Sequence, residues 1–199
     1  MVASITSVEV SALTAIRGGR LLFRDLSFRV DAGRVLCIEG ANGAGKTSLL
    51  RMIAGLLAPS SGTIRVGETE DADERGKFVG WLGHHDAVKP QMTVRESLSF
   101  FVQLYSGGGV EAAMGMVGLT RLAELPGQYL SAGQKKRVAL ARLSLSGRPL
   151  WLMDEPLASL DAAGKKIAAD LIAAHCASGG IAIVATHEPL GIDCERLAL

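Results

Sequence analysis

Cysteine is scarce in this chain of 199 residues, which contains only Cys37, Cys176 and Cys194. Their odd number, wide spacing and lack of a CxxC pair argue against a disulfide framework and against a zinc knuckle. We therefore expect buried or incidental thiols in a protein that works in a reducing compartment.

Long hydrophobic runs are also missing, although 48% of the residues are hydrophobic and the mean hydropathy is +0.28. No apolar run approaches the ~18 residues that a membrane span requires. The opening stretch, MVASITSVEV, lacks the basic and apolar regions of a secretory signal peptide. These absences predict a cytoplasmic chain that does not cross a bilayer by itself.

Neither sign of charge is in excess, because 21 Lys and Arg residues face 20 Asp and Glu residues, for a formal charge of +1. Such a balance disfavours binding to polyanions, so we expect no nucleic acid partner. The length fits one domain, and the sequence shows no internal repeat, low-complexity tract or interdomain linker.

Three short apolar runs, at residues 35–38, 150–153 and 181–185, end in polar or glycine-rich turns. Continuous apolarity of this kind is typical of strands buried on both faces, as in a parallel sheet covered by helices. Residues 46–57 and 161–176 carry apolar side chains at helical spacing, so we expect them to cover that sheet. The pattern predicts an α/β fold.

The remaining segments predict two additions to this core. Residues 7–13, 20–30 and 61–67 are short strand-like runs separated by turns, which favours an antiparallel annex. Residues 91–145 have a helical pattern, and Thr93 with Glu96 three residues later predicts a capping box at a helix start. The glycines of SGGG, residues 106–109, should interrupt that helix.

The stretch GANGAGKT, residues 40–47, follows a predicted strand and opens a predicted helix, and it matches the pattern GxxxxGK[ST]. Glycines at these positions let backbone NH groups curl round a phosphate chain, and the following helix adds its positive N-terminus. Lys46 would reach the terminal phosphates, and Thr47 would supply an oxygen to Mg²⁺. The expected nucleotide-binding residues of this loop are Gly40, Ala41, Asn42, Gly43, Ala44, Gly45, Lys46, Thr47 and Ser48.

A pair of carboxylates ends the apolar run at 150–153. Asp154 is then placed at the carboxyl edge of the sheet, where it can hold Mg²⁺ through water. Glu155 is our candidate general base for an attacking water. Two surface acids at a strand end are the alternative, which the nearby phosphate loop disfavours.

The stretch LSAGQKKRVALARLSLSG, residues 130–147, contains a second helix start suited to an anion, with Ser131 as its N-cap and Gly133 close behind. Residues 40–47 already wrap the phosphates of the chain's own nucleotide. The second helix start is therefore more useful to a nucleotide held by another copy. An ordinary capped helix with a basic face at Lys135, Lys136 and Arg137 remains the alternative.

The segments LSAGQ, VALAR, LMDEP, ASLD and ATH occur in an order and spacing that resemble the ABC ATPases over most of the chain, from about Val8 to Leu190. The resemblance implies a P-loop core with its β annex in residues 1–85 and 141–199, and a helical subdomain in residues 86–140. It also implies a head-to-tail pair of subunits that sandwiches two ATP molecules. Ser131, Gly133 and Gln134 would complete the partner's site, Asp161 would connect the two sites, and His187 would contact the γ-phosphate and attacking water.

The chain has neither the long coiled-coil insertion nor the duplicated cassette of nontransport members, which favours a transporter motor. Residues 17–28, 40–59 and 81–89 resemble the ATP-binding subunits of exporters that serve cytochrome c maturation. That resemblance implies haem delivery at the cytoplasmic face of the inner membrane, with an integral-membrane subunit docked on residues 86–140. An exporter of another substrate and a nontransport ATP switch remain alternatives.

Two positions depart from the general pattern of the ABC ATPases. Arg17 replaces the aromatic residue that usually stacks on adenine, and its guanidinium can also stack on a base. His84 replaces the glutamine that usually contacts Mg²⁺ and water at the hinge between core and helical subdomain. A protonated imidazole would oppose Mg²⁺, so we predict that ATPase activity falls below about pH 6.5 partly through His84.

The adjacent His84 and His85 also raise the alternative of a metal or haem ligand pair. No further Cys, Met or His is spaced to complete such a site, so we expect no ligation here. We expect residues 85–89 to begin the surface that faces the membrane subunit. His175, beside Cys176, is expected to be a packing residue.

Overall fold

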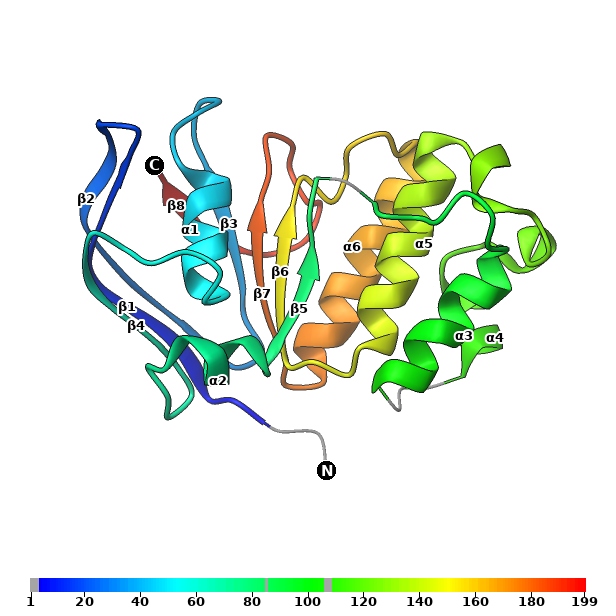
Figure 1. The fold of residues 1–199 in the computed structure, drawn as a ribbon, viewed down its shortest axis with the longest axis horizontal. Helices are drawn as coiled ribbons and strands as arrows, with labels where there is room; N and C mark the ends of the chain where they lie inside the picture. The colour runs from blue at the N-terminus through cyan, green and yellow to red at the C-terminus, as the bar shows by residue number, and fades with distance from the viewer. Residues whose placement is uncertain (1–3, 85, 106–108) are drawn as a thin grey trace.

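The computed structural model describes residues 4–84, 86–105 and 109–199, in which two β-sheets and a group of helices are arranged along the long axis of the molecule (Figure 1). The central sheet is parallel. Its strands, in spatial order, are β5 (Val79–Leu82), β6 (Leu150–Asp154), β7 (Ile181–Ala185), β3 (Val35–Glu39) and β8 (Glu195–Ala198).

Alternate side chains of each central strand enter two different hydrophobic cores. On β3, Leu36 and Ile38 pack into one core, whereas Val35 and Cys37 pack into the other. The same division occurs on β6 and β7. Burial on both faces is the reason for the continuous apolar runs, and the three strands expected from them are confirmed.

The antiparallel annex is also confirmed as a separate sheet in the order β2-β1-β4. These strands are β1 (Ser7–Arg17), β2 (Arg20–Asp31) and β4 (Ser61–Val66). Figure 1 shows this sheet at one end of the molecule, with helix α1 (Lys46–Ile53) between it and the central sheet. Leu49, Leu50 and Ile53 of α1 are fully buried there.

Helix α1 is shorter than the helix expected at residues 46–57, because the chain turns after Ile53. Gly55 has a φ of +78°, and a Cβ at this position would lie 2.3 Å from the carbonyl oxygen of Ala72. A left-handed glycine in such close contact ends a helix. Leu57 lies beyond this turn and still packs against the core.

Helices α5 (Ala132–Leu145) and α6 (Ala162–Ala177) cover the other face of the central sheet, and α3 (Val94–Tyr105) and α4 (Val110–Met116) lie at the far end from the annex (Figure 1). Helix α5 crosses the subdomain boundary expected at residues 140 and 141. The shorter elements are α2 (Ala72–Gly76), η1 (Thr120–Leu122) and η2 (Gly127–Tyr129).

The predicted capping box before α3 is confirmed. The amide of Thr93 donates to Oε2 of Glu96 across 2.8 Å, and the amide of Glu96 donates to Oγ1 of Thr93 across 3.1 Å. The interruption expected at residues 106–109 falls largely outside the described residues, and α4 begins after Gly109. Across the described residues, every helix is too short or too polar to span a bilayer.

The three cysteines are close together in space although they are distant in the sequence. Sγ of Cys37 lies 2.6 Å from Sγ of Cys194, and Cys176 lines the same cavity as Cys194. Burial raises the pKa of Cys37, and it raises the pKa of Cys176 to about 11. Buried, protonated thiols at Cys37 and Cys176 agree with the sequence prediction, while Cys194 is partly exposed.

Candidate nucleotide-binding site

A glycine-rich loop joins β3 to α1 at the carboxyl edge of the central sheet. Gly40, Gly43 and Gly45 have φ values of 151°, 81° and 110°, which other residues rarely adopt. A Cβ on Gly40 would also lie 2.7 Å from the carbonyl oxygen of Leu199. The loop therefore needs glycine at these positions to hold its curled shape.

Lys46, the first residue of α1, has a side chain that folds back over this loop. Its Nζ donates to the carbonyl oxygen of Gly40 across 2.7 Å and lies 3.0 Å from Nε2 of His187. The residue is buried, and the first turn of α1 contains no acidic side chain. The positive charge of the ammonium group and the positive end of the helix dipole, which no acidic side chain neutralises, therefore meet at this loop. This arrangement favours the binding of phosphate.

Thr47 and Asp154 come together from α1 and from the end of β6. Oγ1 of Thr47 donates to Oδ2 of Asp154 across 2.8 Å, and Asp154 is only 6% exposed. Both side chains line the same cavity. A buried carboxylate beside a hydroxyl gives hard oxygen donors of the type that Mg²⁺ prefers, so these residues fit the ion.

Glu155 and His187 follow adjacent strands, β6 and β7, and face each other across the cavity. Oε1 of Glu155 lies 3.5 Å from Nε2 of His187, and the two side chains are 23% and 42% exposed. Glu155 has a φ of 52°, and its amide donates to the carbonyl oxygen of Ala185. A left-handed backbone is strained for a residue other than glycine, and the carboxylate that it carries is partly accessible to water.

These groups line one open cavity of about 840 Å³. Of the residues predicted from sequence, the cavity lining contains Arg17, Asn42, Gly43, Gly45, Lys46, Thr47, Ser48, His84, Asp154, Glu155 and His187. Gly40, Ala41 and Ala44 belong to the same loop without lining the cavity. The structure adds four residues that the sequence reading missed, which are Leu22, Arg51, Trp81 and Gly83.

Arg51 follows Thr47 by one helical turn, so helical spacing could have placed it on the same side of α1. Leu22 and Trp81 reach the cavity from the annex and from β5. Their places depend on how the two sheets pack together, and no local pattern in the sequence carries that information.

The second predicted anion site lies apart from this cavity, because none of its residues line it. Ser131 caps α5 through a reciprocal box: its amide donates to Oε1 of Gln134 across 2.8 Å, and its Oγ accepts from the amide of Gln134. Ser131 is exposed, while a Cβ on Gly133 would lie 2.7 Å from the carbonyl oxygen of Ser159. The helix start is therefore packed closely against the loop that follows Glu155.

Asp161 ends that loop and caps α6, since its Oδ1 accepts a hydrogen bond from the amide of Gly164 across 2.7 Å. The basic face considered for α5 was wrong at Lys136. This lysine is only 2% exposed and forms an ion pair with Asp86 across 2.8 Å.

His84 lies on the cavity wall at the end of β5, and His85 lies outside the described residues. His175 is a packing residue, as expected. Its ring stacks on Trp151 with centroids 3.9 Å apart, and its Nε2 lies 3.2 Å from the carbonyl oxygen of Pro149. In the described part of the chain, no three His, Cys, Asp or Glu residues are grouped so that they could hold a metal ion.

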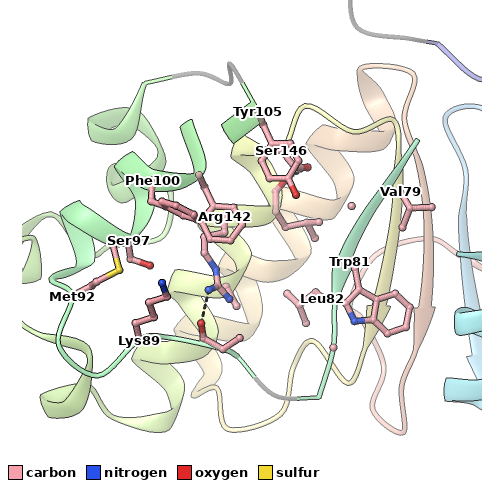
Figure 2. Close-up of a pocket in the computed structure, with 16 residues that line it drawn as sticks. Val79, Trp81, Leu82, Lys89, Met92, Ser97, Phe100, Tyr105, Arg142 and Ser146 are labelled. Carbon is pink, nitrogen blue, oxygen red and sulfur yellow. Dashed lines mark hydrogen bonds between the residues drawn. The ribbon is translucent and has the colours of Figure 1, made fainter. Parts of the chain in front are cut away.

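A second hollow, the inter-helix groove, adjoins this site between β5, α3 and α5 (Figure 2). Its volume is about 510 Å³, and Trp81 and Gly83 line both hollows. Figure 2 shows Phe100 and Tyr105 from α3 and Arg142 from α5 around this space. Phe100 is 47% exposed, so the groove presents an aromatic surface to solvent.

Comparison with known proteins places this site in a family context. The sequence profile described as ABC transporter matches residues 23–158. A protein of Rhodopseudomonas palustris (strain BisB5), named cytochrome c biogenesis ATP-binding export protein CcmA, is 46% identical over 94% of each chain. The protein of the same name from Paramagnetospirillum magneticum is 45% identical over 95% of this chain and 91% of that one.

Solved structures share the fold at lower identity. A putative ABC transporter ATP-binding protein from Pyrococcus furiosus superposes with a TM-score of 0.85, at 22% identity and 98% coverage of both chains. An ATP-binding subunit of an ABC transporter gives a TM-score of 0.81, at 24% identity, over 92% of this chain and 80% of that one. The arrangement of core, annex and helices is therefore that of an ABC ATPase.

Proposed function

Because the chain belongs to the ABC transporter family, and within it to the CcmA group of cytochrome c biogenesis ATP-binding export proteins, we propose that it hydrolyses ATP to power a membrane exporter. The observation that carries this proposal is the meeting of Lys46, Thr47, Asp154, Glu155 and His187 around one cavity.

We assign phosphate binding to the loop of residues 40–48. Its backbone amides and the N-terminus of α1 would hold the phosphate chain, and the ammonium group of Lys46 would neutralise the terminal phosphates. Nζ of Lys46 is now bonded to the carbonyl oxygen of Gly40, so it would leave that partner when a phosphate arrives. Arg17, which lines the cavity, would stack on the base.

Glu155 is proposed as the general base. A water oxygen attacks the γ-phosphorus, the bond to the bridging oxygen of ADP breaks, and the water's proton passes to the Glu155 carboxylate. His187, which lies between Lys46 and Glu155, would orient the γ-phosphate and the water. Thr47 and Asp154 would hold Mg²⁺, which neutralises phosphate charge when it is bound.

The exposed start of α5 supports a shared site. Ser131, Gly133 and Gln134 lie outside the chain's own cavity, and we propose that they complete the nucleotide site of a second copy in a head-to-tail pair. Asp161, at the start of α6, would connect the two sites. In this division residues 1–85 and 141–199 form the core with its annex, and residues 86–140 form the helical subdomain.

The inter-helix groove is the proposed docking place of an integral-membrane subunit. Phe100 of α3 is an exposed part of its lining, and Nζ of Lys89 lies 5.5 Å from the ring centroid of Phe100. A membrane subunit docked here would hold the chain at the cytoplasmic face of the inner membrane. The cargo proposed for this exporter is haem for c-type cytochromes, in keeping with the printed name of the relatives.

Glu155→Gln in cells tests the proposed function. Covalent haem attachment to c-type cytochromes should fail while b-type cytochrome assembly continues, and both are measured by haem staining and absorbance spectra. Glu188→Gln serves as the matched control, because Glu188 lies next to His187 and forms its ion pair with Lys165. Normal c-type assembly in the Glu155→Gln strain would favour an exporter of another substrate or a nontransport ATP switch.

A further inference from the structure

A buried ion pair joins helix α5 to residues 86 and 87, which follow β5 where the family resemblance implies a hinge and which we call the hinge segment. Nζ of Lys136 lies 2.8 Å from Oδ1 of Asp86, and their side chains are 3% and 18% exposed. A lysine so deeply buried is unusual, since a charge in the interior is costly unless it is paired. Removing either partner alone would therefore leave the other charge buried and unpaired.

Arg142, further along the same helix, makes a second connection to this segment. Its guanidinium donates to the carbonyl oxygen of Ala87 across 2.9 Å and also to the carbonyl oxygen of Asp86. Figure 2 shows Arg142 in the inter-helix groove, whose lining also contains Ala87. The guanidinium also lies 5.0 Å from the ring centroid of Phe101 on α3, so it joins three elements.

The two ends of this connection are functionally distinct places. The hinge segment follows Gly83 and His84, which line the nucleotide cavity. Ser131, the N-cap of helix α5, is the residue proposed to face a second copy. Lys136 is five residues from Ser131, about 7.5 Å along the helix axis. A shift of the hinge must therefore move the start of α5 or break a buried ion pair.

We propose that Lys136, Asp86 and Arg142 are positioning residues that make the start of α5 follow the hinge. When a nucleotide displaces Gly83 and His84, the ion pair carries α5 with them and sets the position of Ser131 against the second copy. Well-packed apolar residues often replace a buried ion pair without loss of stability, so stability does not require an ion pair at this place. The inference rests on the proposed pairing of two subunits around ATP.

The test compares the double variant Asp86→Leu/Lys136→Met with its parent, both in a Glu155→Gln background that retains ATP. The double variant should melt near the parent's temperature and bind a fluorescent ATP analogue with unchanged affinity as a monomer. Its ATP-dependent dimerisation, measured by analytical ultracentrifugation, should be weaker by about tenfold. If the pair served only to stabilise the fold, a double variant that melts at the parent's temperature would also dimerise as strongly as the parent.

Two further variants sharpen this comparison. Lys166→Met/Asp170→Leu removes an exposed ion pair on α6 and should leave dimerisation unchanged. Arg142→Met leaves the buried pair intact and should weaken dimerisation by about threefold, which keeps the inference testable if the double variant does not fold. Dimerisation equal to the parent's in either Arg142→Met or a folded double variant overturns the inference. A parent that binds no ATP or stays monomeric with ATP instead overturns the proposed function.

Discussion

Thr47 and Asp154 are 107 residues apart in the sequence, and Oγ1 of Thr47 donates a hydrogen bond to Oδ2 of Asp154 across 2.8 Å. The contact joins the first turn of α1 to the end of β6, so it fixes the phosphate loop against the central sheet. Two oxygen donors are thereby held together at the floor of the cavity before any ion arrives. This preorganisation is what a Mg²⁺ site requires.

Asp154→Asn should weaken the binding of Mg²⁺ and, with it, the part of the ATP affinity that depends on Mg²⁺. The amide keeps the size of the side chain and can still accept a bond from Thr47, but it removes the negative charge that attracts the ion. We expect the affinity for Mg²⁺ to fall by about 10- to 100-fold, measured by titrating Mg²⁺ at fixed ATP. With EDTA present, the variant should bind ATP at least as tightly as the parent, because the carboxylate that repels the phosphates is gone, and weaker binding there would point to a damaged fold.

His175 should make stability depend on pH through its stack with Trp151. Burial lowers the pKa of His175 below its ordinary value of 6.5, so the unfolded chain binds a proton more readily than the folded one. Stability is therefore full above about pH 6.5 and declines as the pH falls toward the lowered pKa of the folded state. His175→Phe keeps an aromatic ring that does not titrate, so its melting temperature should fall less over this range. A decline equal to that of the parent would assign the effect to other groups.

The parts of this protein that the sequence predicts are those with local causes. The strand, loop and helix around residues 35–53 follow from an apolar run, three glycines and a helical stripe, and the caps at Ser131 and Thr93 follow from spacing alone. Such features need only neighbours in the chain, so a reader of the sequence can find them.

The parts that the sequence did not predict depend on packing between distant segments. Cys37 and Cys194 appear unrelated in the sequence, yet they touch because β3 and β8 are neighbours in the sheet. Lys136 stands in a run of basic residues that is typical of a solvent-exposed helix face. However, α5 is covered at this position, and the lysine pairs with Asp86. Burial of a given helix face is decided by tertiary packing, which periodicity does not resolve when apolar and basic residues are mixed.

The central claim is that Glu155 takes the proton of the attacking water. Phosphate release by the purified Glu155→Gln protein, compared with Glu188→Gln and with the parent at saturating ATP and Mg²⁺, tests it most directly. The account predicts a loss of at least about 100-fold in Glu155→Gln with ATP binding retained, and a rate close to the parent's in Glu188→Gln. Hydrolysis by Glu155→Gln at the parent's rate would contradict it.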